Sequence, residues 1–128
     1  MSITRVAIAN PAHAPYGRAA QAALNKYGIW NQIQPKLVLG ENIAQTAQFV
    51  QSGNVDAGIV AVSLLSSPKL QGIGCWVEVP GNLYPPLVQA AVVTRAGASS
   101  KLARQYVTYL GSSEARVILQ RFGFVAPQ

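Results

Sequence analysis

Short apolar runs alternate with amphipathic segments through the first two thirds of the chain, and this pattern predicts alternating strands and helices. Runs of mostly apolar residues that end at a turn residue are typical of strands. They occur at residues 5–10, 36–40, 56–62 and 74–80. After the first run, apolar residues recur at helical spacing from about residue 16 to residue 27, and Gly28 follows as a helix-ending glycine.

Polar residues mark the start of a second predicted helix. Asn42 is a favourable N-cap, and Gln45 three positions later resembles the second half of a capping box. Apolar residues then share one helix face until Gly53 ends the helix. They are Ile43, Ala47 and Val50. A shorter helical turn is expected at residues 63–68, where Pro68 stops it.

The order strand–helix, repeated through residue 80, predicts an α/β fold with a mostly parallel sheet and right-handed crossovers. Ligands of such sheets bind beyond the carboxyl ends of the strands. Here three strand ends lead directly into helix starts, at residues 10–17, 40–43 and 61–65. We therefore expect a ligand site in these loops.

The character of the chain changes where Pro85 and Pro86 precede an extended apolar run. We interpret that run, residues 88–94, as a crossover strand between two structural regions. The predicted domains are accordingly residues 5–86, an α/β domain, and residues 87–128, which hold the crossover strand and the C-terminal helices.

Two helices are predicted in the C-terminal region. The first opens at Ser99 or Ser100 and ends at Gly111. Its apolar face consists of Leu102, Tyr106 and Tyr109. The second is capped by Ser112, and Glu114 is suited to the positive end of its dipole. Its apolar residues follow helical spacing and are Ala115, Ile118, Leu119 and Phe122.

The composition fits one folded domain. The chain has 128 residues, of which half are hydrophobic and 11% are charged. A membrane span needs about 18 consecutive apolar residues, and no run approaches that length. The N-terminus lacks a basic segment followed by a long apolar stretch, so we expect no signal peptide and a cytoplasmic location if the chain is expressed as it stands.

The net charge of +6 comes from ten Lys and Arg against four Asp and Glu. These basic residues are scattered rather than clustered among aromatic residues, so we expect no nucleic-acid partner. Cys75 is the only cysteine, which excludes an intramolecular disulfide. We predict that it is a small buried residue in the strand at 74–80.

Side chains suited to catalysis are few. His13 is the only histidine and Asp56 the only aspartate, and we expect His13 to be an exposed loop residue rather than a catalytic base. The chain has no G-x-S-x-G elbow, no glycine-rich phosphate loop and no cluster of metal ligands. We therefore predict that the protein is not an enzyme and needs no cofactor or metal.

Two predicted helix starts, APYGRAA at 14–20 and GENIAQTAQ at 40–48, carry few reactive side chains. The unpaired amides and the partial positive charge of a helix start can hold an anion without Lys or Arg. Pro15 fixes the local backbone, Gly17 permits close approach, and the Tyr16 hydroxyl can donate a hydrogen bond. The residues alone leave two readings open, an anion site or an ordinary pair of helix starts.

Three motifs resemble the molybdate-binding protein family, the periplasmic oxyanion receptors of molybdate ABC transporters. They are NPxxAPYG at 10–17, GENIAQT at 40–46 and SGNVDAGIVAxS at 52–63. The segment YLGSSEARVILQRFGF at 109–124 also resembles the C-terminal helix of that family. Together these motifs span nearly the whole chain.

The resemblance implies a type II periplasmic-binding-protein fold, in which two α/β lobes enclose an oxyanion, molybdate or tungstate. Carried over by motif, the oxyanion-binding residues are Tyr16, Gly17, Asn42 and Ile43. The implied donors are the backbone N–H groups of Tyr16 and Ile43 and the Tyr16 hydroxyl. Other family members have a ligand-binding Tyr where this chain has Ala61, so we expect Tyr16 to replace that contact.

This chain is expected to depart from the family by lacking the first-lobe segment that, by the resemblance, supplies two hydroxyl-bearing ligand residues. It is expected to hold the second lobe and an incomplete first lobe, and a monomer is expected to bind the oxyanion weakly or not at all. The implied partners are a small tetrahedral oxyanion and the permease of an ABC transporter, and the implied location is the periplasm.

The C-terminal helices would lack part of the sheet that they cover in the family. We therefore expect a homo-oligomer or a rearranged packing to bury their apolar face. The alternative function is a stand-alone homo-oligomeric interaction or regulatory module, built from a binding-protein lobe and without a transport role.

Overall fold

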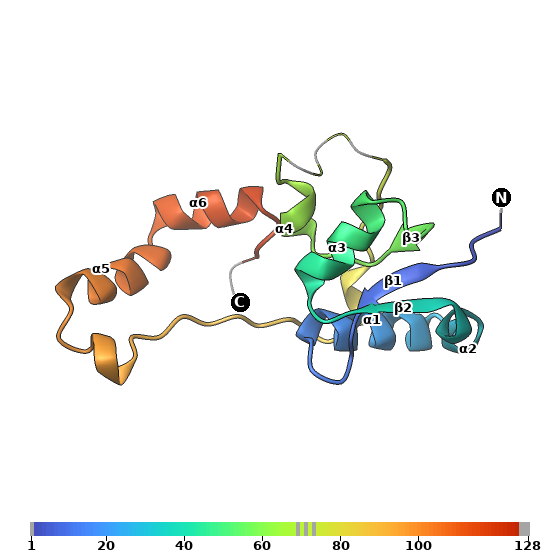
Figure 1. The fold of residues 1–128 in the computed structure, drawn as a ribbon. Helices are drawn as coiled ribbons and strands as arrows, with labels where there is room; N and C mark the ends of the chain where they lie inside the picture. The colour runs from blue at the N-terminus through green and yellow to red at the C-terminus, as the bar shows by residue number, and fades with distance from the viewer. Residues whose placement is uncertain (1, 69, 71, 73, 126–128) are drawn as a thin grey trace. The chain divides into compact units, whose positions relative to one another are not determined.

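The computed structural model describes residues 2–68, 70, 72 and 74–125 (Figure 1). They form two compact units, one that ends at Leu87 and one that begins at Val88. Among the described residues, no helix has the length and apolar character required to cross a membrane.

The first unit is built on a parallel sheet whose strand order is β2-β1-β3. Its strands are β1 (Val6–Ala9), β2 (Leu37–Gly40) and β3 (Ala57–Gly58). All four residues of β1 are buried, because it is the central strand and has a neighbour on each side. The predicted α/β fold with a parallel sheet is thus confirmed.

Each strand is followed by at least one helix. The helices of this unit are α1 (Pro15–Lys26), α2 (Trp30–Ile33), η1 (Gln34–Lys36), α3 (Ile43–Gln51), α4 (Val62–Leu65) and η2 (Gly81–Leu83). The step from β1 to β2 and the step from β2 to β3 run in opposite directions across the sheet. Right-handed crossovers then place α1 and α3 on opposite faces, as Figure 1 shows.

Small residues allow α1 to pack closely on the sheet. The helix buries Gly17, Ala19, Ala20, Ala23 and Leu24. It begins at Pro15, in the position where proline is favoured, and Gly28, which has a φ of 80°, follows its C-cap residue Tyr27. The predicted helix from about 16 to 27 is therefore confirmed to within one residue at each end.

The predicted core face of α3 is only partly right. Ala47 is buried as expected, but Val50 is exposed, and Thr46 is the fully buried residue of the helix. The Thr46 hydroxyl donates to the carbonyl oxygen of Asn42 at 2.9 Å, so its burial leaves no unpaired polar group. A threonine that bonds its own helix can replace an apolar residue in the core.

Three strand predictions need correction. The strand expected at 56–62 is reduced to β3, although the Ile59 amide still donates to Ala7 at 2.9 Å. Described residues 74–80 and 88–94 form no strand, because no neighbouring segment forms ladder hydrogen bonds with them. Val77 in the first segment is 88% exposed and Val88 in the second is 81% exposed.

The prediction that Cys75 is buried in a strand is also wrong. Its thiol is free and exposed, because the segment that carries it is not part of the sheet. Residues 69, 71 and 73, just before this segment, lie outside the described residues.

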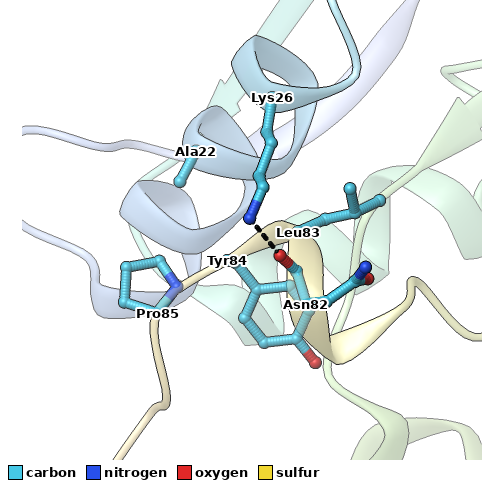
Figure 2. Close-up of a pocket in the computed structure, with 6 residues that line it drawn as sticks. All are labelled: Ala22, Lys26, Asn82, Leu83, Tyr84 and Pro85. Carbon is cyan, nitrogen blue, oxygen red and sulfur yellow. Dashed lines mark hydrogen bonds between the residues drawn. The ribbon is translucent and has the colours of Figure 1, made fainter.

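The chain returns to α1 after residue 80. Figure 2 shows the Lys26 ammonium group donating to the carbonyl oxygen of Asn82, at 2.6 Å. Beside this bond lies an open pocket of about 370 Å³. Its lining residues are Ala22, Lys26, Asn82, Leu83, Tyr84 and Pro85.

The second unit contains η3 (Arg95–Gly97), α5 (Lys101–Leu110) and α6 (Ser113–Arg121). Ser100 and Ser112 cap the two α-helices through their side chains, as predicted. Several apolar residues of these helices are exposed. They are Leu102, Tyr106, Tyr109, Val117, Ile118 and Phe122.

Candidate functional site

The loops that follow β1 and β2 leave the sheet at the same edge. The two strands are parallel and paired, with Ala9 opposite Gly40 at their carboxyl ends. The Asn10 amide continues the pairing by donating to the Gly40 carbonyl oxygen at 2.7 Å. One loop then enters α1 and the other enters α3. The sheet therefore brings together two of the three loops that the sequence predicts as a ligand site.

Asn10 organises the loop before α1. Its side-chain oxygen accepts from the Ala12 amide at 3.0 Å, and its carbonyl oxygen accepts from the Ala14 amide at 2.9 Å. Ala14 is extended, and α1 starts with Pro15, which has no N–H group. The first amide of α1 is therefore that of Tyr16, at the second helical position.

Gly17 has a packing role that the sequence did not indicate. Gly17 is buried, and a Cβ atom added to it would lie 2.2 Å from the carbonyl oxygen of Ala9. The start of α1 thus rests directly on the end of β1. The close approach that glycine permits at this position includes that of the strand.

The start of α3 is capped as predicted. The Asn42 side-chain oxygen accepts from the Gln45 amide at 2.9 Å. The Gln45 side chain accepts in return from the amide of Glu41 at 2.7 Å, one residue earlier than in a standard capping box. The side-chain oxygen of Asn42 therefore stabilises the helix. Asn42 contributes to the candidate site by fixing the backbone at the start of α3.

Ile43 is the first residue of α3. The first regular helical bond at this end is donated by the Thr46 amide to the Asn42 carbonyl oxygen, at 3.1 Å. Helix geometry leaves the amide of Ile43 without an acceptor inside the helix. This amide and the dipole of α3 together give the loop a partial positive charge.

A side-chain contact that the sequence did not reveal connects the two loops. The Nε2 atom of His13 lies 3.1 Å from a carboxylate oxygen of Glu41 and also 3.1 Å from its carbonyl oxygen. The side chains are 49% and 73% exposed. His13 is thus a partly exposed loop residue, as expected, but it has a partner 28 positions away.

The third predicted loop and the pocket contribute little to this arrangement. Residues 61–65 lead into α4, which is only four residues long. The pocket in Figure 2 lies beside Lys26, ten residues and about 15 Å along α1 from Tyr16. Within 2–68, 70, 72 and 74–125, no group of three or more His, Cys, Asp and Glu could hold a metal ion.

Comparisons with known proteins agree with the motifs. The profile of a family described as "Bacterial extracellular solute-binding protein" matches residues 2–125. The molybdate-binding protein ModA of Azotobacter vinelandii is 41% identical over 120 residues, which cover 93% of this chain and 47% of that protein. ModA of Rhodobacter capsulatus is 38% identical over 123 residues, covering 96% and 48% of the two chains.

A solved structure supports the fold. The periplasmic molybdate-binding protein of Azotobacter vinelandii matches this chain with a TM-score of 0.87 at 30% identity, covering 100% of this chain and 56% of that one. This chain spans about half the length of the curated relatives it matches. The resemblance that the motifs indicate is confirmed, and the chain belongs to the family of bacterial extracellular solute-binding proteins, which bind solutes and are not enzymes.

Proposed function

We propose that this chain supplies part of an oxyanion-binding site for molybdate or tungstate, in a periplasmic protein that delivers its ligand to the permease of an ABC transporter. Residues 5–86 would be the second lobe and residues 87–128 part of the first. The proposal rests on one observation: the helices α1 and α3 both begin at the same edge of the sheet, after the paired strands β1 and β2. Two similar proteins are named molybdate-binding.

The proposed donors are the amides of Tyr16 and Ile43 and the Tyr16 hydroxyl. Gly17 holds the start of α1 through its close backbone contact with Ala9, and Asn42 holds the start of α3 through its side-chain cap. Amides at helix starts are oriented before the ligand arrives and carry the positive end of the dipole. A set made only of donors favours a fully ionised tetrahedral dianion over an anion that must itself donate a proton.

The affinity of this chain alone is proposed to be weak. The chain covers 56% of the solved relative, and the resemblance implies two further ligand residues outside the matched region. We expect a dissociation constant for molybdate above about 1 μM, which corresponds to about 8 kcal/mol of binding free energy. Submicromolar binding by a monomer would contradict this part of the proposal.

Titration of the ¹⁵N-labelled chain with molybdate, tungstate and sulfate, followed by amide NMR shifts, tests the site directly. We expect saturable shifts at Tyr16, Gly17, Asn42 and Ile43, larger for molybdate and tungstate than for sulfate. Sodium chloride at matched ionic strength serves as the control for general screening. Shifts that are no larger than those produced by chloride would overturn the proposal.

Ile43→Pro tests the proposed amide donor of α3 most directly. Proline is favoured at the first helical position, and Asn42 before it is already extended, so the substitution removes the proposed donor while leaving the helical bonds intact. Ile43→Ala is the matched control, because it removes the same side chain but keeps the amide. We expect Ile43→Pro to bind molybdate about tenfold more weakly than Ile43→Ala.

A second candidate is a stand-alone, self-associating interaction or regulatory module. It is favoured by the exposed apolar residues of α5 and α6, among them Leu102, which is 77% exposed. Light scattering after size-exclusion chromatography distinguishes it from the first proposal. A folded chain that stays monomeric at high concentration would exclude obligate self-association.

A further inference from the structure

The side chain of His13 spans the gap between the two loops of the proposed site. His13 lies in the loop that enters α1, and Glu41 lies between β2 and the N-cap of α3. One ring nitrogen, Nε2, is 3.1 Å from the Glu41 carbonyl oxygen and 3.1 Å from a carboxylate oxygen. A proton on Nε2 therefore faces two acceptors of the same residue.

Both ends of this link are held by further hydrogen bonds. On one side, the His13 amide donates to the Asn10 carbonyl oxygen at 3.3 Å. On the other, the Glu41 amide donates to the Gln45 side chain at 2.7 Å. The Glu41 residue is thus fixed through its N–H by α3 and through its C=O by His13. A link between two anchored segments restricts how far those segments can separate.

The need for such a link follows from the topology. Pairing of the strands ends with the bond between Asn10 and Gly40, and beyond it the loops lead to helices on opposite faces of the sheet. An anion held by both helix starts requires a fixed distance between them, because N–H···O hydrogen bonds have lengths of about 2.7–3.2 Å. His13 bridges the loops just beyond the last paired residues.

We infer that His13 is a positioning residue, which fixes the separation of the two oxyanion-binding helix starts by bonding to the carbonyl oxygen of Glu41. This inference rests on the proposed function. The bond to a backbone carbonyl persists whether the imidazole is neutral with its proton on Nε2 or fully protonated. The carboxylate of Glu41 is a secondary acceptor, so we expect the link between the loops to depend on the His13 imidazole more than on the Glu41 carboxylate.

Three variants of the full chain separate these contributions. His13→Ala removes the link, and His13→Gln retains an N–H group of similar reach. Glu41→Ala removes the carboxylate but keeps the carbonyl acceptor. We expect His13→Ala to weaken molybdate binding about two- to tenfold, as measured by the NMR titration, and we expect His13→Gln to restore most of the loss. Glu41→Ala should bind within about twofold of the wild type or more tightly, since it also removes a negative charge.

Urea unfolding of each variant shows whether the loss reflects the site or the fold. The His13 side chain is half exposed, so all three variants should remain folded at the titration temperature. A His13→Ala chain that binds like the wild type, or a His13→Gln chain as weak as His13→Ala, overturns the inference alone. A wild-type chain that shows no site-specific binding overturns the proposed function and this inference with it.

Discussion

A Cβ atom at Gly17 would lie 2.2 Å from the carbonyl oxygen of Ala9, so the first turn of α1 is in backbone contact with the end of β1. We expect Gly17→Ala to force the helix away from the strand, because the obstacle is backbone that cannot rotate aside. Overpacking of this kind costs about 1–3 kcal/mol of unfolding free energy. Urea unfolding followed by circular dichroism measures the loss.

Gly81 provides the matched control for that substitution. A Cβ atom there would meet nothing within 4 Å. We expect Gly81→Ala to change the unfolding free energy by no more than about 0.5 kcal/mol. Equal effects of the two substitutions would show that the contact between α1 and β1 is not what requires glycine at position 17.

Asn42 allows helix stability and ligand affinity to be separated. Its side chain caps α3 by accepting from the Gln45 amide at 2.9 Å, and removal of such a cap in Asn42→Ala is expected to cost about 1 kcal/mol. Asn42→Asp should keep the cap and gain from the helix dipole. However, its carboxylate stands directly before the Ile43 amide, so we expect weaker oxyanion binding through like-charge repulsion.

Urea unfolding and the molybdate titration test both halves of this prediction on the same three proteins. The expected order of stability places Asn42→Asp near or above the wild type and Asn42→Ala below it. For molybdate affinity, Asn42→Asp is expected to be the weakest. If Asn42→Asp bound molybdate as well as the wild type, an oxyanion site at the start of α3 would be contradicted.

The hydroxyl of Tyr16 is predicted to donate to the bound oxyanion. Tyr16→Phe keeps the backbone amide at the start of α1 and removes the proposed hydroxyl donor. We expect molybdate binding to weaken about tenfold, the effect of losing a hydrogen bond to a charged group. Tyr27→Phe is the control, because Tyr27 is the exposed C-cap of the same helix. Calorimetry or the NMR titration gives the two affinities.

The elements that could be predicted from the sequence are those whose ends are set by local chemistry. Pro15 and Gly28 delimit α1, and Asn42 and Gly53 delimit α3, each through its own backbone preference or side-chain bond. The segment at residues 74–80 has the composition of a strand but is not one. A strand depends on hydrogen bonds to a neighbour elsewhere in the chain, which composition alone does not specify.

The candidate site shows the same division. The cap at Asn42 was predictable, because its partner Gln45 lies three residues away. The link from His13 to Glu41 joins residues 28 positions apart and exists only because β1 pairs with β2. Neither residue type nor spacing signals that contact in advance. The contact between Gly17 and Ala9 likewise depends on how α1 packs on β1, which the local sequence does not specify.

Asp56 connects the start of β1 to the start of β3 and should make stability depend on pH. One carboxylate oxygen accepts from the Thr4 amide at 2.7 Å, the Thr4 hydroxyl at 2.8 Å and the Arg5 amide at 3.0 Å. These bonds, those of Thr4 foremost, lower the pKa of Asp56. A carboxyl whose pKa is lower in the folded state stabilises the fold above its unfolded pKa of about 3.9, and this contribution disappears as the pH falls through the folded value.

We therefore expect urea midpoints of the wild type to exceed those of Asp56→Asn between pH 5 and 7, and to converge on them as the pH falls below about 4. A difference that stays constant down to pH 2 would mean that the carboxylate charge contributes nothing at this position.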